Sequence, residues 1–469
     1  MPPISSPGIG SGLDVNSIIS QLLSIERQPI DVLRAKTARI QTQISEYGKL
    51  KSAISAFRDA SLKLTSNDTW GMTVGTSSDS ASVAVTAKTG AAAGGYALEV
   101  QTLAKAQSLA SGVFASADAT PGAGTLRIEL GAWGAGQTAF TPKAGATAVD
   151  ITVEATDTLA QVRDKINAAN AGVTALVFTD ANGSRLLMRS TATGAENAFR
   201  TSGVTALAFD PSAGATAMSQ TEAAGNAAAT LNGLPIVSAS NTLVNLVDGV
   251  TLTLGKVTTA PVEIKVVQDN ESLKKAVQAF ADSYNALNTL LAGQVKYDAA
   301  TRVAGPLQGD SSAVGMQRQL RALMGTPSGA SSVFSRLSDV GLALQKDGSL
   351  SVTAAKLDTA LANLPELKKV FANTDLGDPG NNGLARQFRM MGDSLLSVDG
   401  VITTRSDGLR KRIELNEDQQ ERLDLRVAQV EKRLRAQYTA LDATLGRLSG
   451  IGSYVTQQMA ALSGNNNRN

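Results

Sequence analysis

The chain has 469 residues with 43 basic and 41 acidic side chains, so its net charge at neutral pH is only +2. This balance gives no electrostatic reason to expect a nucleic acid or an anionic membrane surface as a partner. The sequence has no cysteine and no histidine, which excludes disulfides, thiolate metal sites, cysteine nucleophiles and imidazole bases.

The start of the chain carries no conventional export signal. Residues 1–8 lack the basic segment followed by an apolar segment that marks a general secretory signal. No stretch approaches the roughly 20 apolar residues of a membrane helix, so we expect no membrane insertion. The protein is therefore expected to be cytoplasmic, or to leave the cell by an export pathway that recognises another feature of the chain. Residues 2–12 are predicted to be disordered.

Two helices are predicted next. Asp14 can cap the first, and its broad apolar face carries Val15, Ile18, Ile19, Leu22, Leu23 and Ile25. Pro29 is expected to break or kink this helix and suits the first turn of the second. Positions alternating four and three apart form one stripe on the second helix, at Leu33, Thr37, Ile40, Ile44, Tyr47, Lys51 and Ile54. This spacing is typical of a coiled-coil seam.

β-structure is predicted from residue 71, where charged residues become sparse and short alternating apolar runs appear. A disordered linker is the alternative for such Ala-, Gly- and Thr-rich sequence. One strand–helix–hairpin unit stands out. Residues 150–154 form its strand, Thr158 and Gln161 a capping box for its helix, and residues 173–178 and 185–189 its hairpin.

A polar, alanine-rich connection is expected over residues 209–225, and strands resume up to residue 267. Helices return at Ser272. Asp310 is expected to cap another helix, and a hairpin turns at Asp347-Gly348. Two more helices are predicted, after Thr353 and after Gly383.

The last long stretch, residues 405–448, repeats the four-three spacing. Its stripe consists of Leu409, Ile413, Asn416, Gln420, Leu423, Val427, Val430, Leu434, Gln437, Leu441, Thr444 and Leu448. Most of these are apolar and the other faces are charged, which indicates the seam of a coiled coil. Such a helix needs partners, in the same chain or in copies of it. An ordinary helical bundle is the alternative.

The order of helices, β insert and helices predicts an α+β multidomain fold with terminal coiled-coil legs, a helical bundle and inserted β-rich domains. We expect leg helices at residues 1–45 and 425–469. A helical bundle with a β-hairpin would comprise residues 46–70 and 270–424. A β domain would comprise residues 71–125 and 221–269, with a nested β-rich domain containing one helix at residues 126–220.

No site for chemistry is predicted. Residues 8–12, a glycine-rich run, follow no strand and lack the lysine of a phosphate loop. Residues 180–184 resemble the start of a calcium loop, but its twelfth position is Thr191 and not glutamate. The carboxylates of Glu417, Asp418 and Glu421 are expected on a solvated helix face. We therefore expect no enzyme, no catalytic residue, no cofactor and no metal.

Several motifs resemble one family, the flagellar filament cap proteins or hook-associated protein 2. They are Gly8-Ile9-Gly10-Ser11-Gly12-Leu13-Asp14-Val15, Ile18-Ile19-Ser20-Gln21-Leu22-Leu23, Glu26-Arg27-Gln28-Pro29-Ile30, Tyr284-Asn285-Ala286-Leu287-Asn288, Gly341-Leu342, Lys346-Asp347-Gly348-Ser349-Leu350, Gly400-Val401-Ile402 with Arg405, and Tyr438 through Tyr454, Gln457, Gln458 and Met459. The strand–helix unit at residues 151–177 resembles a motif shared by flagellin-like and hook-associated proteins.

This resemblance implies a homo-oligomeric ring, often a pentamer, at the distal tip of a growing bacterial flagellum. Such a ring retains exported flagellin and promotes its folding and insertion. The resemblance also implies secretion through the flagellar type III pathway. The implied partners are copies of the chain, flagellin, the hook-associated filament-junction proteins and an export chaperone. A coiled-coil surface adhesin or scaffold with no part in filament assembly is the rival hypothesis.

The apolar faces of the legs are predicted to dock between filament subunits and between copies, and to be mobile in the isolated protein. The residues expected there are Ile18, Leu22, Ile25, Leu423, Val427, Val430, Leu434, Leu441, Leu445, Tyr454 and Val455.

Overall fold

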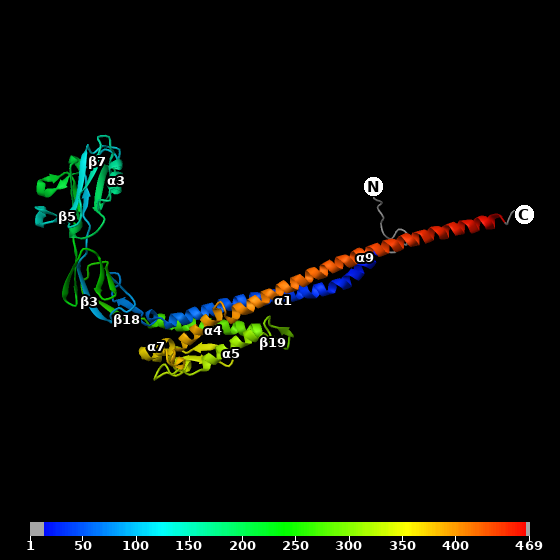
Figure 1. The fold of residues 1–469 in the computed structure, drawn as a ribbon. Helices are drawn as coiled ribbons and strands as arrows, with labels where there is room; N and C mark the ends of the chain where they lie inside the picture. The colour runs from blue at the N-terminus through cyan, green and yellow to red at the C-terminus, as the bar shows by residue number, and fades with distance from the viewer. Residues whose placement is uncertain (1–13, 466–469) are drawn as a thin grey trace. The chain divides into compact units, whose positions relative to one another are not determined.

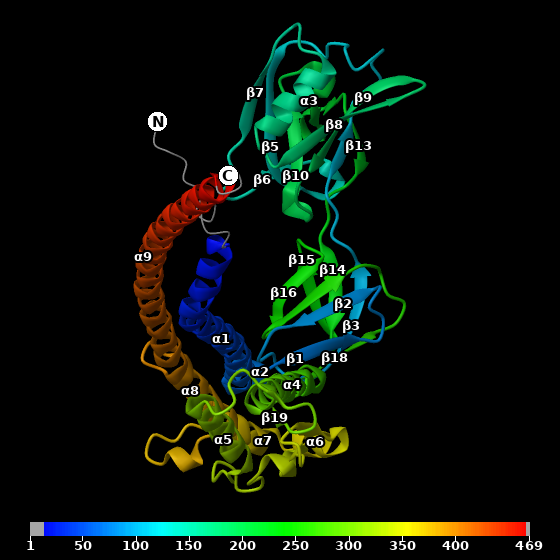
Figure 2. The same cartoon turned by 90° about the vertical axis from the view of Figure 1, so that its right-hand side faces the viewer.

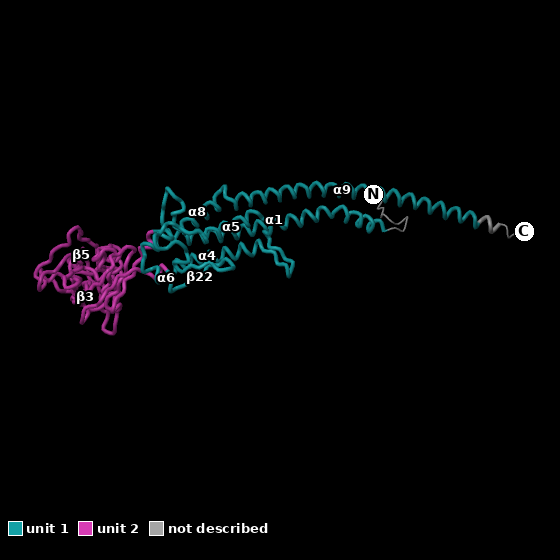
Figure 3. The backbone as a smooth tube through the Cα atoms, turned by 90° about the horizontal axis from the view of Figure 1, so that it is seen from below, with its two compact units in different colours: residues 1–66, 274–469 teal, residues 67–273 magenta. Residues whose placement is uncertain are grey.

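A computed structural model describes the backbone of residues 14–465 and the side chains up to residue 460. Residues 2–12, which we expected to be disordered, lie outside the described part. The chain forms two compact units (Figure 3): Met1–Ser66 with Lys274–Asn469, and Asn67–Leu273. The first is mostly helical and the second mostly β-sheet, so the prediction of an α+β fold with β-rich insertions between terminal helices is confirmed.

The first unit combines long helices with two small hairpins. Its helices are α1 (Val15–Thr65), α4 (Asn270–Val295, which begins at the unit boundary), α5 (Ser311–Gly325), α6 (Ala354–Leu361), α7 (Leu364–Ala372), α8 (Leu384–Leu396) and α9 (Val401–Asn465). Its hairpins are β19 (Tyr297–Asp298) with β20 (Val303–Ala304), and β21 (Leu342–Leu344) with β22 (Leu350–Val352). Short 3-10 turns lie at Leu337–Val340 and Pro379–Asn381.

Aromatic side chains form the centre of this helical unit. The ring of Phe57 from α1 lies 5.3 Å from that of Phe280 in α4 and 5.2 Å from that of Phe388 in α8. Phe371 of α7 contacts Phe280 edge-on. All four side chains are fully buried, and aromatic pairs of this kind add about 0.5–1.5 kcal/mol each beyond burial. This cluster joins α1 and α4 with α7 and α8, which lie much further along the sequence.

Of the break or kink expected at Pro29, the break is wrong, because α1 continues through it and no second helix starts there. A proline inside a helix removes one backbone hydrogen bond, at a cost of about 3 kcal/mol. Leu23 and Ile30, on either side of it, are buried in one hydrophobic cluster with Val427, which holds both halves of α1 against α9. The ribbon of α1 changes direction in its N-terminal part (Figure 2). The expected stripe position Lys51 is exposed, and Leu50 is buried in its place.

The second unit begins with α2 (Asn67–Trp70) and contains two β-layered parts with separate cores. In the first part a five-stranded and a three-stranded antiparallel sheet share one core. Their strands, in spatial order, are β1 (Thr73–Ser77), β18 (Val262–Gln268), β3 (Gly94–Thr102), β14 (Ala227–Leu231) and β15 (Leu234–Ser238), and then β16 (Thr242–Val247), β17 (Val250–Leu254) and β2 (Val83–Ala87). The turns at Asn232-Gly233 and Asp248-Gly249 are confirmed by the β14–β15 and β16–β17 pairings.

The second part packs α3 (Leu159–Ala168) with two further sheets around another core. One sheet runs β12 (Ala215–Thr216), β11 (Phe209–Asp210), β10 (Ala198–Ser202), β5 (Gly124–Trp133) and β6 (Phe140–Pro142), with β7 (Val149–Val153) also paired to β5. The other runs β13 (Ser219–Glu222), β4 (Ser108–Ala110), β9 (Gly183–Ser190) and β8 (Val173–Asp180). Short 3-10 turns lie at Ala135–Gln137, Ala195–Asn197, Thr205–Leu207 and Pro211–Ala213.

The predicted strand–helix–hairpin unit is confirmed by β7, α3, β8 and β9, and the capping box by reciprocal Thr158 and Gln161 bonds. The reading of residues 209–225 as a bare connection is wrong, because it contains β11, β12 and β13. Phe209 and Met218 are buried in the core of this part and anchor those strands. The sequence did not reveal these two core residues, because the residues around them are mostly polar or alanine.

Candidate assembly surface on the helical rod

Helices α1 and α9 lie side by side and antiparallel over much of their length, and together they form the rod (Figure 1). Val15, Ile19, Leu23 and Ile30 of α1 form a buried cluster with Val427 of α9. Leu423, Val430, Leu434 and Tyr438 of α9 pack against this cluster and are partly buried. These side chains are the seam of the rod. Each fully buried aliphatic side chain stabilises the pairing by about 1.5–3 kcal/mol.

Polar contacts fix the alignment of the two helices. The buried hydroxyl of Thr37 accepts hydrogen bonds from the side-chain amides of Asn416 (3.4 Å) and Gln420 (3.5 Å). Further along, Arg426 lies 3.7 Å from Glu26. A polar layer in an otherwise apolar seam specifies register at some cost in stability. The contacts place residue 26 level with 426, and residue 37 level with 416.

Arg435 and Asn16 extend the same alignment to the end of α1. The guanidinium donates a hydrogen bond of 3.4 Å to the Asn16 side-chain oxygen. Helix α1 begins just beyond this contact, at Val15, and α9 continues to Asn465.

At the other end of the rod, three segments meet at one buried carboxylate. Asp310 caps α5 through the backbone N–H groups of Ser312 and Ala313. It also accepts a hydrogen bond of 2.7 Å from the Tyr47 hydroxyl and one of 2.9 Å from Nε of Arg405. The carboxylate therefore ties α1, α5 and α9 together.

The protonation of this group follows from its partners. Burial alone would raise the pKa of Asp310, but hydrogen bonds from Tyr47 and Arg405 and the positive charge of Arg405 lower it below the usual value. Burial, followed by the bond to Asp310, raises the pKa of Tyr47. At neutral pH the site is therefore a carboxylate held by a neutral phenol and a guanidinium.

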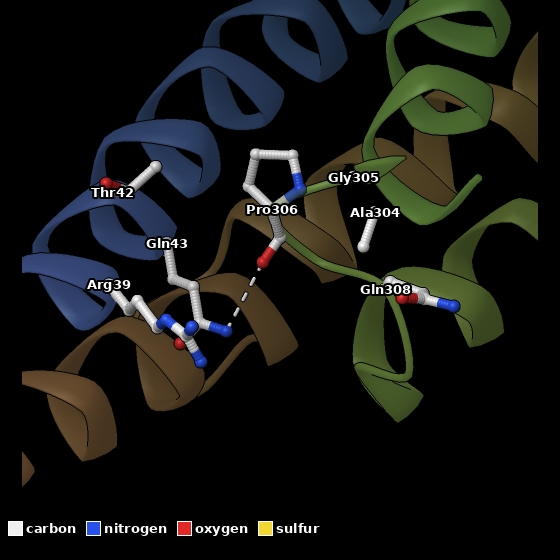
Figure 4. A pocket seen from close by; sticks show the side chains of 7 residues that line it. All are labelled: Arg39, Thr42, Gln43, Ala304, Gly305, Pro306 and Gln308. Carbon is white, nitrogen blue, oxygen red and sulfur yellow. Dashed lines mark hydrogen bonds between the residues drawn. The ribbon is translucent and has the colours of Figure 1, made fainter. Parts of the chain in front are cut away.

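A groove of about 430 Å³ opens beside the rod near this point (Figure 4). Arg39, Thr42 and Gln43 of α1 form one wall, and the loop after β20 forms the other. The Gln43 amide donates a hydrogen bond of 3.3 Å across it to the Pro306 carbonyl. Arg39 is the only ionisable side chain among the lining residues, which are otherwise Ala304, Gly305, Pro306, Gln308, Thr42 and Gln43. The groove thus lacks the paired acid and base that proton-transfer chemistry would require.

Beyond Tyr438, the seam stripe of α9 continues with the same four-three spacing through Leu441, Leu445, Leu448 and Val455. We call residues 441–460 the tail. The first turn of α1 lies level with the residues just before the tail, and large apolar side chains of the tail are exposed, for example 58% of Leu448 and 62% of Tyr454. An exposed apolar stripe on a helix marks a surface that another protein segment covers.

The predicted docking residues fall into three groups. Leu423, Val427, Val430 and Leu434 lie in the seam and pack against α1 of their own chain. Ile18 is half-buried, and Leu22 and Ile25 are exposed on α1. Leu441, Tyr454 and Val455 are exposed on the tail, with Leu445 half-buried. Their docking role stays a prediction.

Sequence reasoning did not assign Ile19, Leu23, Ile30 and Tyr438 to the contact surface. The signal was present, because the stripe through Leu33 and Thr37 extends backwards to Ile30, Leu23 and Ile19. Expecting a break at Pro29 separated the two halves of that stripe. On α9 the expected stripe passed through Gln437 and Thr444, whereas the structure follows Tyr438 and Leu445.

Within residues 14–460, no three acidic side chains gather in a way that could hold a metal ion. Across the described helices, none is both long and apolar enough to cross a membrane.

Three family models match the chain. Residues 11–107 match the N-terminal and residues 224–450 the C-terminal part of flagellar hook-associated protein 2. Residues 137–192 match the flagellin hook IN motif, around the strand–helix–hairpin unit. These ranges include α1, most of α9, the first β-layered part, and α3 with β6 to β9 of the second.

Full-length relatives are similar over nearly the whole chain. Flagellar hook-associated protein 2 of Escherichia coli K12 is 32% identical over 480 residues, which cover 98% of both chains. The A-type flagellar hook-associated protein 2 of Pseudomonas aeruginosa is 30% identical over 484 residues, covering 97% of both. The crystal structure of the flagellar cap protein FliD D1-D2-D3 domains from Escherichia coli matches with a TM-score of 0.61 at 30% identity, covering 78% of this chain and 99% of that one. The family is structural, as the lack of an acid–base site in the sequence predicted. The chain belongs to the flagellar hook-associated protein 2 family, the flagellar cap proteins.

Proposed function

We propose that this protein caps the flagellar filament as a homo-oligomeric ring, retaining exported flagellin and promoting its folding and insertion. It is secreted and works outside the cell, at the distal flagellum tip. Its partners are copies of itself, in a ring that we expect to be a pentamer, together with flagellin, the hook-associated filament-junction proteins and an export chaperone. The capping role is supported by the similarity to the crystal structure of the D1-D2-D3 domains of the Escherichia coli flagellar cap protein, and by the full-length hook-associated protein 2 relatives.

The observation that carries the proposal is the exposed stripe of the tail. Leu441, Leu448 and Val455 lie on one helix face that α1 of the same chain does not reach. An apolar stripe of this kind needs a helical partner, and a filament built from helical rods supplies one. A narrow stripe also forms a small interface, which binds weakly. The leg can therefore detach from the filament each time a subunit is inserted.

We propose that the four domains defined from the sequence have different roles. Residues 1–45 and 425–469 would be the legs, and residues 46–70 with 270–424 the bundle that supports them. Residues 71–125 with 221–269, and the nested residues 126–220, would form the outer plate.

The test replaces Leu441, Leu448 and Val455 with serine in the full chain and returns the gene to a strain that lacks it. We expect normal secretion of the cap variant, flagellin monomers lost into the medium, and no swimming. The matched control is Leu376→Ser, because Leu376 is 95% exposed on a loop before α8, away from the tail. Normal swimming of the tail variant would contradict the proposed function.

A further inference from the structure

Helix α1 carries a second apolar stripe, which faces away from the seam. Ile18, Leu22, Ile25, Pro29 and Val32 alternate four and three residues apart, and each precedes a seam position by one residue. We call this set the lateral stripe. Ile25 is 62% and Val32 54% exposed, although both lie at the level where α1 and α9 are paired. The pairing of the rod therefore leaves the lateral stripe uncovered.

The outer side of α9 presents a matching feature at the same height. Leu425 stands two residues after the seam residue Leu423, about 200° around the helix, and is 61% exposed. The Glu26–Arg426 pair places Leu425 level with the lateral stripe, between Ile25 and Val32. An exposed leucine on one face and a row of apolar side chains on another fit each other as knob and hole.

The two stretches that carry these faces have net charges of opposite sign. Residues 22–39 of α1 contain Arg27, Arg34, Lys36 and Arg39 against Glu26 and Asp31, a net charge of 4 − 2 = +2. The level stretch of α9, residues 414–431, contains Glu414, Glu417, Asp418, Glu421, Asp424 and Glu431 against Arg422 and Arg426, a net charge of 2 − 6 = −4. A stretch of net positive charge in one copy attracts a stretch of net negative charge in the next.

The directions of the two faces favour a closed assembly. At about 100° per residue, the lateral stripe and Leu425 point roughly 85° apart around the rod. For rods parallel to the ring axis, a head-to-tail contact between two faces of one rod that point well apart from each other, and not in opposite directions, closes a small ring. Because both faces lie at one height on the rod, the contact needs no shift along the axis.

We infer that the lateral stripe of α1 packs on the acidic outer face of α9 around Leu425 in the next copy of the chain. The contact is heterologous, since two different faces meet, and it repeats from copy to copy around the ring. This inference rests on the proposed function for the existence of a ring, and adds which surfaces form it at the level of the rods. The tail stripe remains available to the filament.

Cysteine pairing tests the contact directly, because the chain has no cysteine of its own. Full-length Ile25→Cys and Leu425→Cys chains are purified separately, mixed under conditions of assembly, and oxidised. A disulfide requires Cα atoms within about 7 Å, so it reports this contact and excludes distant ones. The matched control replaces Ile25→Cys with Ser24→Cys, an exposed residue on the opposite side of the seam.

We expect covalent dimers in the Ile25→Cys mixture, and none above background in the Ser24→Cys mixture or in either variant alone. Molar mass in solution is measured on the same samples. Rings without the dimer, or equal dimer yields with both α1 variants, would overturn the inference and leave the proposed function standing. Chains that remain monomeric would overturn both. Dimers of Ile25→Cys alone would replace the heterologous contact with a symmetric one.

Discussion

The hydroxyl of Tyr47 donates a hydrogen bond of 2.7 Å to the carboxylate of Asp310, 263 residues away in the sequence. Tyr47 is fully buried on α1, and Asp310 caps α5. Arg405 completes the site from α9. The junction between the rod and the helical bundle is thus held by a polar contact inside an apolar interior. Removing one partner would leave the remaining buried polar groups without a hydrogen-bond partner, which is destabilising.

The first prediction concerns Tyr47→Phe, which removes the phenol hydroxyl and keeps the ring. Loss of a hydrogen bond to a charged group is expected to lower the free energy of unfolding of the helical unit by about 1.5–3 kcal/mol. Helical circular dichroism during urea unfolding measures it. Both tryptophans, Trp70 and Trp133, belong to the β-rich unit, so their fluorescence midpoint should stay unchanged and serves as the control. A helical midpoint equal to that of the parent would show that the bond contributes nothing.

The second prediction concerns acid. The folded-state pKa of Asp310 lies below its unfolded value, so this carboxylate stabilises the fold above pH ~4 and loses that contribution as pH falls through the folded pKa. Asp310→Asn should therefore flatten the loss of helical stability between about pH 5 and pH 2. Other carboxylates act with the same sign, including Glu366, whose pKa is lowered to about 2 by hydrogen bonds from Lys369 and Ser331. The measured quantity is accordingly the difference between parent and variant, and parallel curves would refute the assignment.

The third prediction concerns the loss of stability at alkaline pH, which depends on Tyr47. Its pKa is raised in the fold, so its contribution is complete below the unfolded value near 10 and is lost as the pH rises above it. The parent should lose helical stability above about pH 10 more steeply than Tyr47→Phe. A difference that grows as the pH falls instead would contradict the assigned sign.

The fourth prediction concerns the polar layer of the seam. Replacing Thr37 and Asn416 together by leucine should make the rod more stable, because an apolar seam replaces a hydrogen-bonded one. The same change should loosen register and partner choice, producing a broader distribution of assemblies in analytical ultracentrifugation. The matched control is Val427→Leu, which keeps the seam apolar and the Thr37 layer intact. A double variant that is more stable and still forms a single species would argue against a register-setting role.

The fifth prediction concerns the strand–helix–hairpin unit. Thr158→Ala removes the cap of α3 and should lower the stability of the β-rich unit by about 1 kcal/mol, read from tryptophan fluorescence. Thr158→Ser is the conservative control and should retain most of the stability. An unchanged midpoint for alanine would mean that packing of Leu159, Val162 and Ile166 alone fixes the helix.

Much of this fold was predictable because its signals are local. Asp14, Asp310 and Thr158 cap the helices expected of them, and the turns at Asn232-Gly233 and Asp347-Gly348 join the expected strands. These motifs depend on a few neighbouring residues whose backbone preferences are strong.

Other features depend on contacts between distant segments. The continuity of α1 through Pro29 requires the packing of Leu23 and Ile30 against α9, which outweighs the local preference of proline. The site around Asp310 joins residues 47, 310 and 405, and no local pattern links them. The sequence also could not show which of the predicted docking residues are buried in the seam and which are exposed. That assignment requires the register between α1 and α9.

Hydrogen exchange of residues 441–460 in the full-length protein, with and without capless flagellar filaments, examines the main proposal most closely. Amide protons of a helix without tertiary packing exchange quickly, and docking slows them. We expect fast exchange in the free protein and strong protection on filaments, with the Phe57 region slow in both states. Slow exchange of the tail in the free protein, or fast exchange on filaments that are capped and elongating, would contradict the account.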